Sequence, residues 1–422
     1  MRIGKVFYII FFTLILVVPV SAYIDPATGS MLLSALIGII ASSWFLLKQV
    51  IMKLKFFSPS GKGEASRHSL VLYSEGPQYW GVFKPLLDEL VQRGEPCAYM
   101  TAHPDDPGLK YESDLVKTSY IGQGNRAYMR LNFLEADVCV ATTPGLDVLQ
   151  FKRSKRVKHY CHILHHLNNT STYRLFGIDY YDSILLNGPH QEGIIRELEK
   201  KRGTPLKDLR IVGSTYLDSL FEKKKVLQLS ENKDFTILIS PSWGPNGLLR
   251  RYGMDLLGPL AESGMKLILR PHPQSSISEK EILEELKISL ASYGNVQWDF
   301  NKENIHAMAQ SDIMISDFSS IMFDYIFLFS RPVAVFNFNL DPRGFDLSDI
   351  EEENPYYMVK DSGAILHFDA DDLASVPERI KTLTMDPHLQ ENIERLKVYA
   401  CRHQGEAGSR SVDAILEIRE NL

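Results

Sequence analysis

The chain is organised around two segments, LILRPHPQS at residues 267–275 and SDIMISDFSSIMFDYIFLFSRPVAVF at residues 311–336. In each, a short apolar run stops abruptly at polar residues, which is typical of a buried strand that ends in a loop at a sheet edge. The second loop leads into an apolar run, Ile321 to Phe329, with the length of a helix. Strand, loop and helix in this order predict an α/β fold.

The two loops carry residues suited to binding phosphate. Arg270-Pro271-His272-Pro273 brings a cation and an imidazole to the end of the first strand, on a loop stiffened by proline. Ser316-Asp317-Phe318-Ser319-Ser320 follows the second strand, and such residues cap a helix while leaving its N-terminal amides free for an anion. Ligands of open α/β sheets lie at the carboxyl ends of strands, so we expect a phosphate site here. A rigid turn and a simple N-cap are the alternatives.

The same pattern recurs before and after these segments. Short apolar runs end in polar loops at residues 70–73, 98–101, 138–141, 156–164, 183–186 and 209–212, and again at 235–239, 296–298 and 333–336. A basic helical stretch near residue 220 separates the two series. We therefore predict an α/β domain at residues 68–220, a second at 230–388 and closing helices at 389–422, with a cleft between the two domains.

The composition of the 422 residues is that of an ordinary globular protein, with 23% charged and 45% hydrophobic residues. A net charge of -6 argues against a nucleic acid as the main partner. The four cysteines are widely scattered, which favours neither a zinc ribbon nor a disulfide scaffold and fits a reducing compartment.

Residues 1–57 differ from the rest. Val6 to Val20 is apolar after a basic start, which is typical of a signal peptide or first membrane helix, and Met31 to Leu47 is apolar and followed by lysines. We predict one or two transmembrane helices that anchor the protein in the cytoplasmic membrane, with the body facing the cytoplasm because the lysines follow the span. A secreted protein with a lipid-like anchor is the alternative.

Four short motifs occur in the order PSWGPNG (241–247), RPHP (270–273), SDFSSIMFDY (316–325) and RGF (343–345). With them the chain resembles the CDP-glycerol glycerophosphotransferase family, which includes teichoic-acid polymerases and primases, from about Leu70 to Glu417. The resemblance implies two Rossmann-like domains in a GT-B-like arrangement. It also implies transfer of glycerol phosphate from CDP-glycerol to a hydroxyl of a lipid-linked or surface-glycan acceptor, with release of CMP and without a cofactor or metal.

The resemblance also suggests residue roles. The family's early His-Gly pair corresponds here to His162-Ile163-Leu164-His165-His166-Leu167, which has no glycine; His165 is the best match for the catalytic base, and His166 is the fallback. A base must accept the proton of the attacking hydroxyl, and cations and helix amides must hold the donor phosphates. Besides Arg270 and His272, which would stabilise the pyrophosphate, the implied donor-binding residues are Ser242, Gly244, Asp317, Ser319, Ser320 and Asp324.

Other interpretations stay open at this point. The donor could be CDP-ribitol or a nucleotide sugar, or the protein could be a non-catalytic membrane scaffold, which the absent glycine would suit. His162 and His166 would share one face of a helix and could bind a metal if this stretch were helical. Asp317 could cap a helix or bind donor hydroxyls, and Trp243 could stack on cytosine or pack at a domain interface.

Overall fold

The computed structural model describes residues 37–40, 42–44, 47, 67–227, 234–336, 341–350, 364–368 and 370–422. The chain divides into two compact units, Met1–Ser66 and Arg67–Leu422. The predicted apolar segment at residues 6–20, and most of the one at 31–47, lie outside the described residues. Among the residues that are described, no helix is long and apolar enough to cross a membrane.

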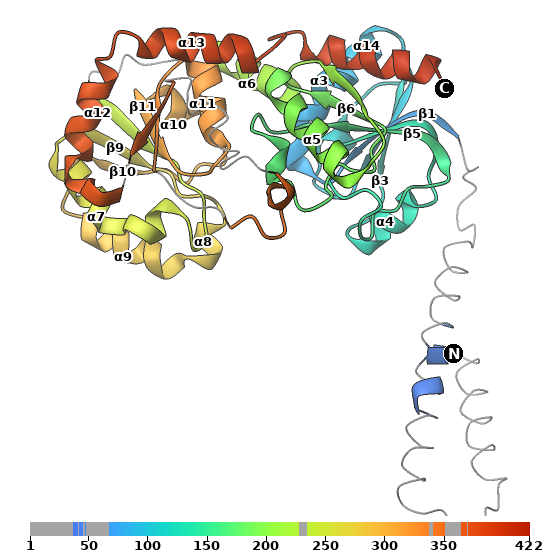
Figure 1. The fold of residues 1–422 in the computed structure, drawn as a ribbon, viewed down its shortest axis with the longest axis horizontal. Coiled ribbons are helices and arrows are strands. Elements are labelled where there is room, and N and C mark those ends of the chain that lie inside the picture. Colours follow the sequence, from blue (N-terminus) through green and yellow to red (C-terminus); the bar gives the residue numbers. More distant parts are fainter. Residues whose placement is uncertain are drawn as a thin grey trace, which may run out of the picture. The chain divides into compact units, whose positions relative to one another are not determined.

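The first half of this unit is built on a seven-stranded sheet in the order β3-β2-β1-β4-β5-β6-β7 (Figure 1). Every neighbouring pair in it is parallel. The strands are β1 (His68–Ser74), β2 (Cys97–Thr101), β3 (Val116–Tyr120), β4 (Glu135–Ala141), β5 (Arg156–Ile163), β6 (Ser183–Leu186) and β7 (Asp208–Ile211). The connecting α-helices are α3 (Trp80–Gln92), α4 (Asn125–Leu131), α5 (Glu192–Arg202) and α6 (Thr215–Lys225).

The second half contains a parallel six-stranded sheet in the order β10-β9-β8-β11-β12-β13. Its strands are β8 (Thr236–Ile239), β9 (Lys266–Leu269), β10 (Val296–Trp298), β11 (Ile313–Ser316), β12 (Val333–Phe336) and β13 (Ile365–Phe368). The helices after α6 are α7 (Leu248–Glu262), α8 (Ser275–Ser278), α9 (Lys280–Leu290), α10 (Ile305–Ala309), α11 (Ile321–Phe329), α12 (Val376–Thr384), α13 (Leu389–Ala400) and α14 (Ala407–Glu420).

The prediction of an α/β fold with two parallel sheets is confirmed. The central strands were recognisable because burial on both faces makes them continuous apolar runs, as in TILI and IMIS. The strands that we did not predict are β3 and β13, which lie at the sheet edges. The sequence of β3, VKTSY, is only partly buried and shows no apolar run.

Each sheet has one point at which the strand order reverses, between β1 and β4 in the first and between β8 and β11 in the second. At such a point the loops leaving the two strands diverge to opposite faces and open a crevice, which is where ligands bind in open α/β sheets. PSWGPNG follows β8 and SDFSS spans the end of β11. The topology therefore brings these two motifs to the same crevice.

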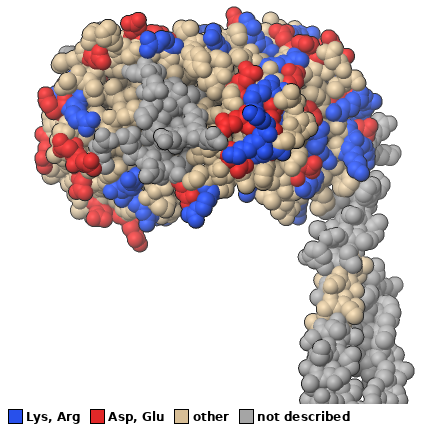
Figure 2. Space-filling model, in the orientation of Figure 1, with Lys and Arg blue, Asp and Glu red and all other residues tan. Residues whose placement is uncertain are grey.

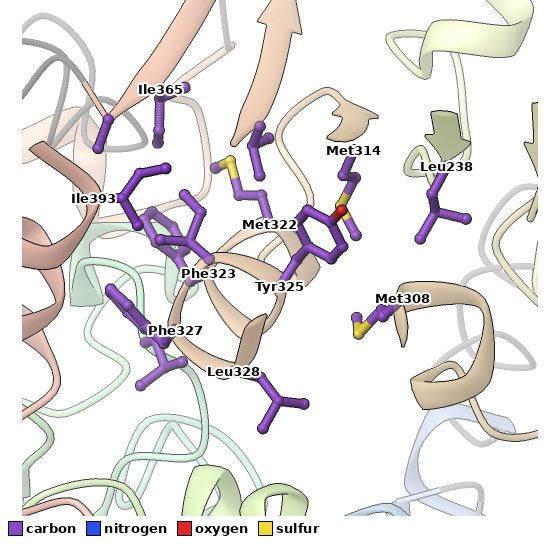
Figure 3. Packing of buried hydrophobic residues seen from close by; sticks show 14 of the residues in the cluster. Leu238, Met308, Met314, Met322, Phe323, Tyr325, Phe327, Leu328, Ile365 and Ile393 are labelled. Atoms are coloured by element: carbon purple, nitrogen blue, oxygen red, sulfur yellow. The ribbon is translucent and has the colours of Figure 1, made fainter. Parts of the chain in front are cut away.

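Helix α11 forms the centre of the largest apolar cluster (Figure 3). It begins directly after Ser320 and buries nearly its whole circumference, since six of its nine residues are buried: Met322, Phe323, Tyr325, Ile326, Phe327 and Leu328. The helices around it include α10, which contributes Met308, and α13, which contributes Ile393 (Figure 3). This packing holds the N-terminus of α11 in place at the crevice.

Besides the α6 connection, the C-terminal helices α13 and α14 also join the two halves. Helix α13 packs in the second half against α11, whereas α14 packs in the first half, where Val412 and Ile415 lie in the same cluster as Phe83 of α3 (Figure 1). The C-terminal helices, predicted only as a closing element, therefore cover both halves. On the face shown in Figure 2, basic and acidic side chains are interspersed.

A short segment of the second half, residues 341–350, also binds the first half. Its Gly344 carbonyl accepts the Leu175 N–H at 2.9 Å, and the Asp346 N–H donates to the Tyr173 carbonyl at 2.8 Å. The Arg202 guanidinium forms ion pairs with Asp346 and with two further aspartates, Asp179 and Asp349. The RGF motif thus lies in a contact between the halves.

The burial of α11 leads to a test with matched leucines. Leu328, at 1% exposure, lies in the α11 cluster, whereas Leu206 is 80% exposed. We expect Leu328→Ala to lower the free energy of unfolding by about 2–5 kcal/mol, because it leaves a cavity. Leu206→Ala should change it by less than about 0.5 kcal/mol. Urea unfolding followed by circular dichroism measures both, and equal effects would contradict the packing described.

Candidate active site

One pocket of ≈ 620 Å³ is lined by residues from both halves. From the first half come residues of the loops after β1 and β5 and of helices α3 and α6. From the second half come residues of the loops after β9 and β11 and of α11. The lining residues are Gln78, Tyr79, Val82, His165, His166, Leu167, Asn168, Thr172, Tyr216, His272, Phe318, Ser320 and Asp324.

Three histidines gather where β5 ends. His162 is the next-to-last residue of β5 and shares a 3.0 Å hydrogen bond between its Nε2 and the Tyr173 hydroxyl. His165 and His166 follow in the loop, and their rings also pack against Tyr173. The ring of Tyr79 meets that of His165 edge-on, with the centroids 4.9 Å apart. Aromatic rings therefore fix the orientation of the histidines.

Burial and mutual repulsion keep these histidines neutral. Burial lowers the pKa of His162 to about 3 and that of His166 to about 4. Burial, then the neighbouring His166 and His162, hold the pKa of His165 well below its usual value. Among the described residues, nothing forms a hydrogen bond with Nδ1 of His165, whereas the His166 ring interacts with Asn168. A neutral ring with a free nitrogen can accept a proton or a hydrogen bond from a ligand.

On the second-half side of the pocket, the Asp317 carboxylate links the loop after β8 to the loop after β11. Its carboxylate, 5% exposed, accepts hydrogen bonds from the N–H and hydroxyl of Ser242, at 2.9 and 2.6 Å, from the Leu248 N–H at 3.0 Å and from the Ser319 N–H at 3.2 Å. Leu248 is the first residue of α7, so Asp317 also caps that helix. Burial raises the pKa of Asp317, and these hydrogen bonds offset part of the rise.

The PSWGPNG loop needs its glycines. Gly244 has φ 95°, in the region that favours glycine, and its N–H donates to Glu279 at 3.0 Å. A Cβ at Gly247 would lie 2.8 Å from the Ser242 carbonyl oxygen. Trp243, 46% exposed, stands near His272, with ring centroids 6.4 Å apart. The loop is therefore held tightly while its tryptophan stays open to solvent.

His272 presents a defined hydrogen-bond donor. Its Nδ1 accepts the Gln274 N–H at 3.1 Å, so in the neutral ring the proton is on Nε2. Burial lowers the pKa of His272, with Asp317 and Glu279 acting in the opposite direction. His272 lines the pocket, and its Nε2–H can donate to an anion there.

Arg270 is engaged within the protein. Its guanidinium forms a buried ion pair with Asp299 and donates to the Asn301 carbonyl at 2.7 Å. Asp299 in turn accepts the Asn301 N–H at 3.0 Å. Arg270 therefore joins the loop after β10 to the RPHP loop, and it does not line the pocket.

The predicted site residues fall into two groups. His165, His166, His272, Ser320 and Asp324 line the pocket. Ser242, Gly244, Asp317, Ser319 and Arg270 lie outside its lining, in the loops that support it. Sequence reasoning missed Gln78, Tyr79 and Tyr216, which also line it. Tyr79 had a usable signal, since it closely follows a predicted strand, but Tyr216 lies on a helix that we read only as a connection.

The metal alternative required residues 162–166 to be helical, and that premise is wrong. His162 belongs to strand β5 and His166 to the loop beyond it, so the helical spacing does not apply. Within the part of the chain that the structure describes, there is no group of three or more histidines, cysteines or acids arranged to hold a metal ion.

Comparison with known proteins agrees with the motifs. The sequence model of the CDP-glycerol:poly(glycerophosphate) glycerophosphotransferase family matches residues 196–375. The family resemblance is confirmed over this stretch. It includes the motifs from PSWGPNG to RGF but not His165. Comparison with curated protein sequences finds no match.

Solved structures with the same fold carry several activities. The wall teichoic acid polymerase TagF soaked with CDPG aligns with TM-score 0.57 and 17% identity over 91% of this chain and 98% of its own. UDP-GlcNAc 2-epimerase from Neisseria meningitidis aligns with TM-score 0.55 and 13% identity, over 82% and 99% of the two chains. A glycosyltransferase from Rickettsia africae gives 0.50 and 10%, over 85% and 100%. The GT-B-like prediction for the fold is thus confirmed.

The role of Asp317 in holding the two loops together is testable with a matched control. In Asp317→Asn one carboxylate oxygen becomes an NH₂ group that faces protein N–H donors, which should lower the free energy of unfolding by roughly 1–3 kcal/mol. Asp255→Asn, at an exposed position of α7, should have little effect. Thermal unfolding measures both, and equal stability of the two variants would refute the role.

Proposed function

We propose that the protein transfers glycerol phosphate from CDP-glycerol to a hydroxyl of a lipid-linked or surface-glycan acceptor and releases CMP. The observation that carries this proposal is the single pocket in which His165 and His166 of the first half meet His272 and Ser320 of the second. The family match over residues 196–375 supports the choice of donor.

The second half is suited to hold the donor pyrophosphate. Ser320 is exposed directly before α11, whose N-terminal amides favour an anion. Nε2–H of His272 adds a neutral donor, and Arg270, through its ion pair with Asp299, holds in place the loop that carries His272. In this proposal Ser319 and Ser320 bind the phosphates, while Asp317, Ser242 and Gly244 keep the two loops in place.

The first half then supplies the proton acceptor. The acceptor hydroxyl attacks the β-phosphorus, and His165 takes its proton, with His166 as the alternative. Neutral His165 is ready to accept that proton near pH 7, because its pKa lies below its usual value. The new phosphodiester forms as the bond to CMP breaks.

We expect His165→Ala and His272→Ala each to lower kcat/KM for CMP release by roughly 10² to 10³, the usual cost of losing a well-placed polar group. His388→Ala is the control, because that side chain is 77% exposed. The assay uses CDP-glycerol with membrane extract as acceptor. It contains EDTA, because the resemblance implies chemistry without a metal, and turnover should persist.

The same assay separates the alternatives. Turnover with CDP-ribitol or a UDP-sugar, but not with CDP-glycerol, would show that the protein uses another donor. Absence of CMP release with every acceptor would favour a non-catalytic scaffold. Near-wild-type turnover of both histidine variants would refute the assigned roles.

We also propose that residues 1–57 anchor the protein in the cytoplasmic membrane with its body facing the cytoplasm. The apolar segments and the lysines after the second of them support this. In sealed inside-out vesicles, a protease added outside should digest the body of the full-length protein. In right-side-out vesicles the body should be protected, and the opposite pattern would reverse the orientation.

A further inference from the structure

The pocket contains an acidic side chain that the proposed chemistry has not used. Asp324 lies in the first turn of α11, four residues after Ser320, so both residues are on the same face of the helix and both line the pocket. Ser320 marks the expected phosphate end of this helix. The carboxyl of Asp324 therefore lies close to where the donor phosphates would bind.

The surroundings of this carboxyl are unusual for an acid. The Tyr216 hydroxyl on α6 donates to its Oδ2 at 3.5 Å, and within the described residues no lysine, arginine or histidine forms an ion pair with it. The other titratable groups lining the pocket are Tyr79 and the histidines. Of the helices packed against α11, α6 carries Lys224, which donates to the Leu328 carbonyl in the last turn of α11. Helix α10 carries His306, and α13 carries Lys397, which binds Ser330 beyond the far end of α11.

These surroundings favour the neutral acid. Asp324 keeps some surface open to the pocket, but protein encloses its carboxyl enough for burial to raise its pKa to about 7, and the hydrogen bond from Tyr216 limits the rise. The charge of Asp324, together with burial, raises the pKa of the Tyr216 phenol, so the phenol stays a donor. The pKa of His165 is shifted in the opposite direction.

Two titratable groups whose environments move their pKa values apart are suited to opposite proton-transfer roles. A neutral imidazole accepts a proton, and a protonated carboxyl donates one. Beside a pyrophosphate an ionised carboxylate would be repelled, whereas the neutral acid can form a hydrogen bond with it. The pocket therefore contains a base on the first half, His165, and an acid on the second half, Asp324.

We propose that Asp324 is the general acid of the transfer, giving its proton to the phosphate of the departing CMP, and that Tyr216 is a positioning residue for its carboxyl. This inference rests on the proposed function and adds a catalytic residue to it.

The protons balance over one turnover. The acceptor oxygen forms a bond to the β-phosphorus and its proton goes to His165. The bond between the β-phosphorus and the bridging oxygen breaks, the electron pair stays on that oxygen, and Asp324 protonates it. His165 ends as the cation and Asp324 as the anion, and exchange with water restores both.

The test is the pH dependence of kcat/KM, which reports groups of the free enzyme. Because Asp324 acts in its protonated form, activity should fall as the pH rises through about 7. Asp324→Asn keeps a hydrogen-bond donor but cannot transfer a proton. We expect its turnover to fall by at least roughly 10², the fall at alkaline pH to disappear, and CDP-glycerol binding measured by calorimetry to persist.

A second variant tests the positioning role and does not remove the acid. The hydrogen bond from Tyr216 lowers the pKa of Asp324, so Tyr216→Phe should raise that pKa and move the alkaline fall in activity to higher pH. Tyr120→Phe, at a 42% exposed position, is the matched control and should leave the profile unchanged.

The outcomes distinguish this inference from the function on which it rests. If the wild-type protein releases no CMP from CDP-glycerol, the proposed function fails and the acid role fails with it. If the wild type is active, an alkaline fall that persists in Asp324→Asn overturns the acid role alone. A fall that stays in place or moves to lower pH in Tyr216→Phe overturns the positioning role.

Discussion

The buried carboxylate of Asp317 is the interaction on which the second half of the site depends. A charge at 5% exposure is costly unless polar groups surround it, and here Ser242, Leu248 and Ser319 donate to it. These donors come from the loop after β8, the start of α7 and the loop after β11. One side chain thereby fixes the crevice at the topological switch point of the second sheet.

The pocket as a whole depends on contacts between the halves. Tyr173 connects them most directly, because its carbonyl accepts the Asp346 N–H of the second half while its ring and hydroxyl contact the histidines. Arg202 strengthens the same contact through its ion pairs with Asp346 and Asp349. The position of the histidines is thus coupled to the RGF segment.

Electrostatics distinguishes the two walls of the pocket. The first wall holds His165 and His166 in surroundings that disfavour a positive charge, and the second holds Asp324 in surroundings that disfavour a negative one. Both effects come from desolvation, so they depend on what encloses each group. Neither could be predicted from residue type, because the same histidine or aspartate on a surface would titrate near its usual pKa.

The α/β class, every central strand of the two sheets and the family resemblance could be predicted from the sequence alone, because buried strands and loop motifs are local patterns along the chain. The sequence also predicted five of the pocket residues, among them His165 and Asp324. Only the tertiary structure showed that Arg270 pairs with Asp299, that Asp317 fastens two loops and that Tyr216 reaches Asp324. Those contacts join residues as much as 108 positions apart, and a local pattern carries no information about which distant group will meet a given side chain.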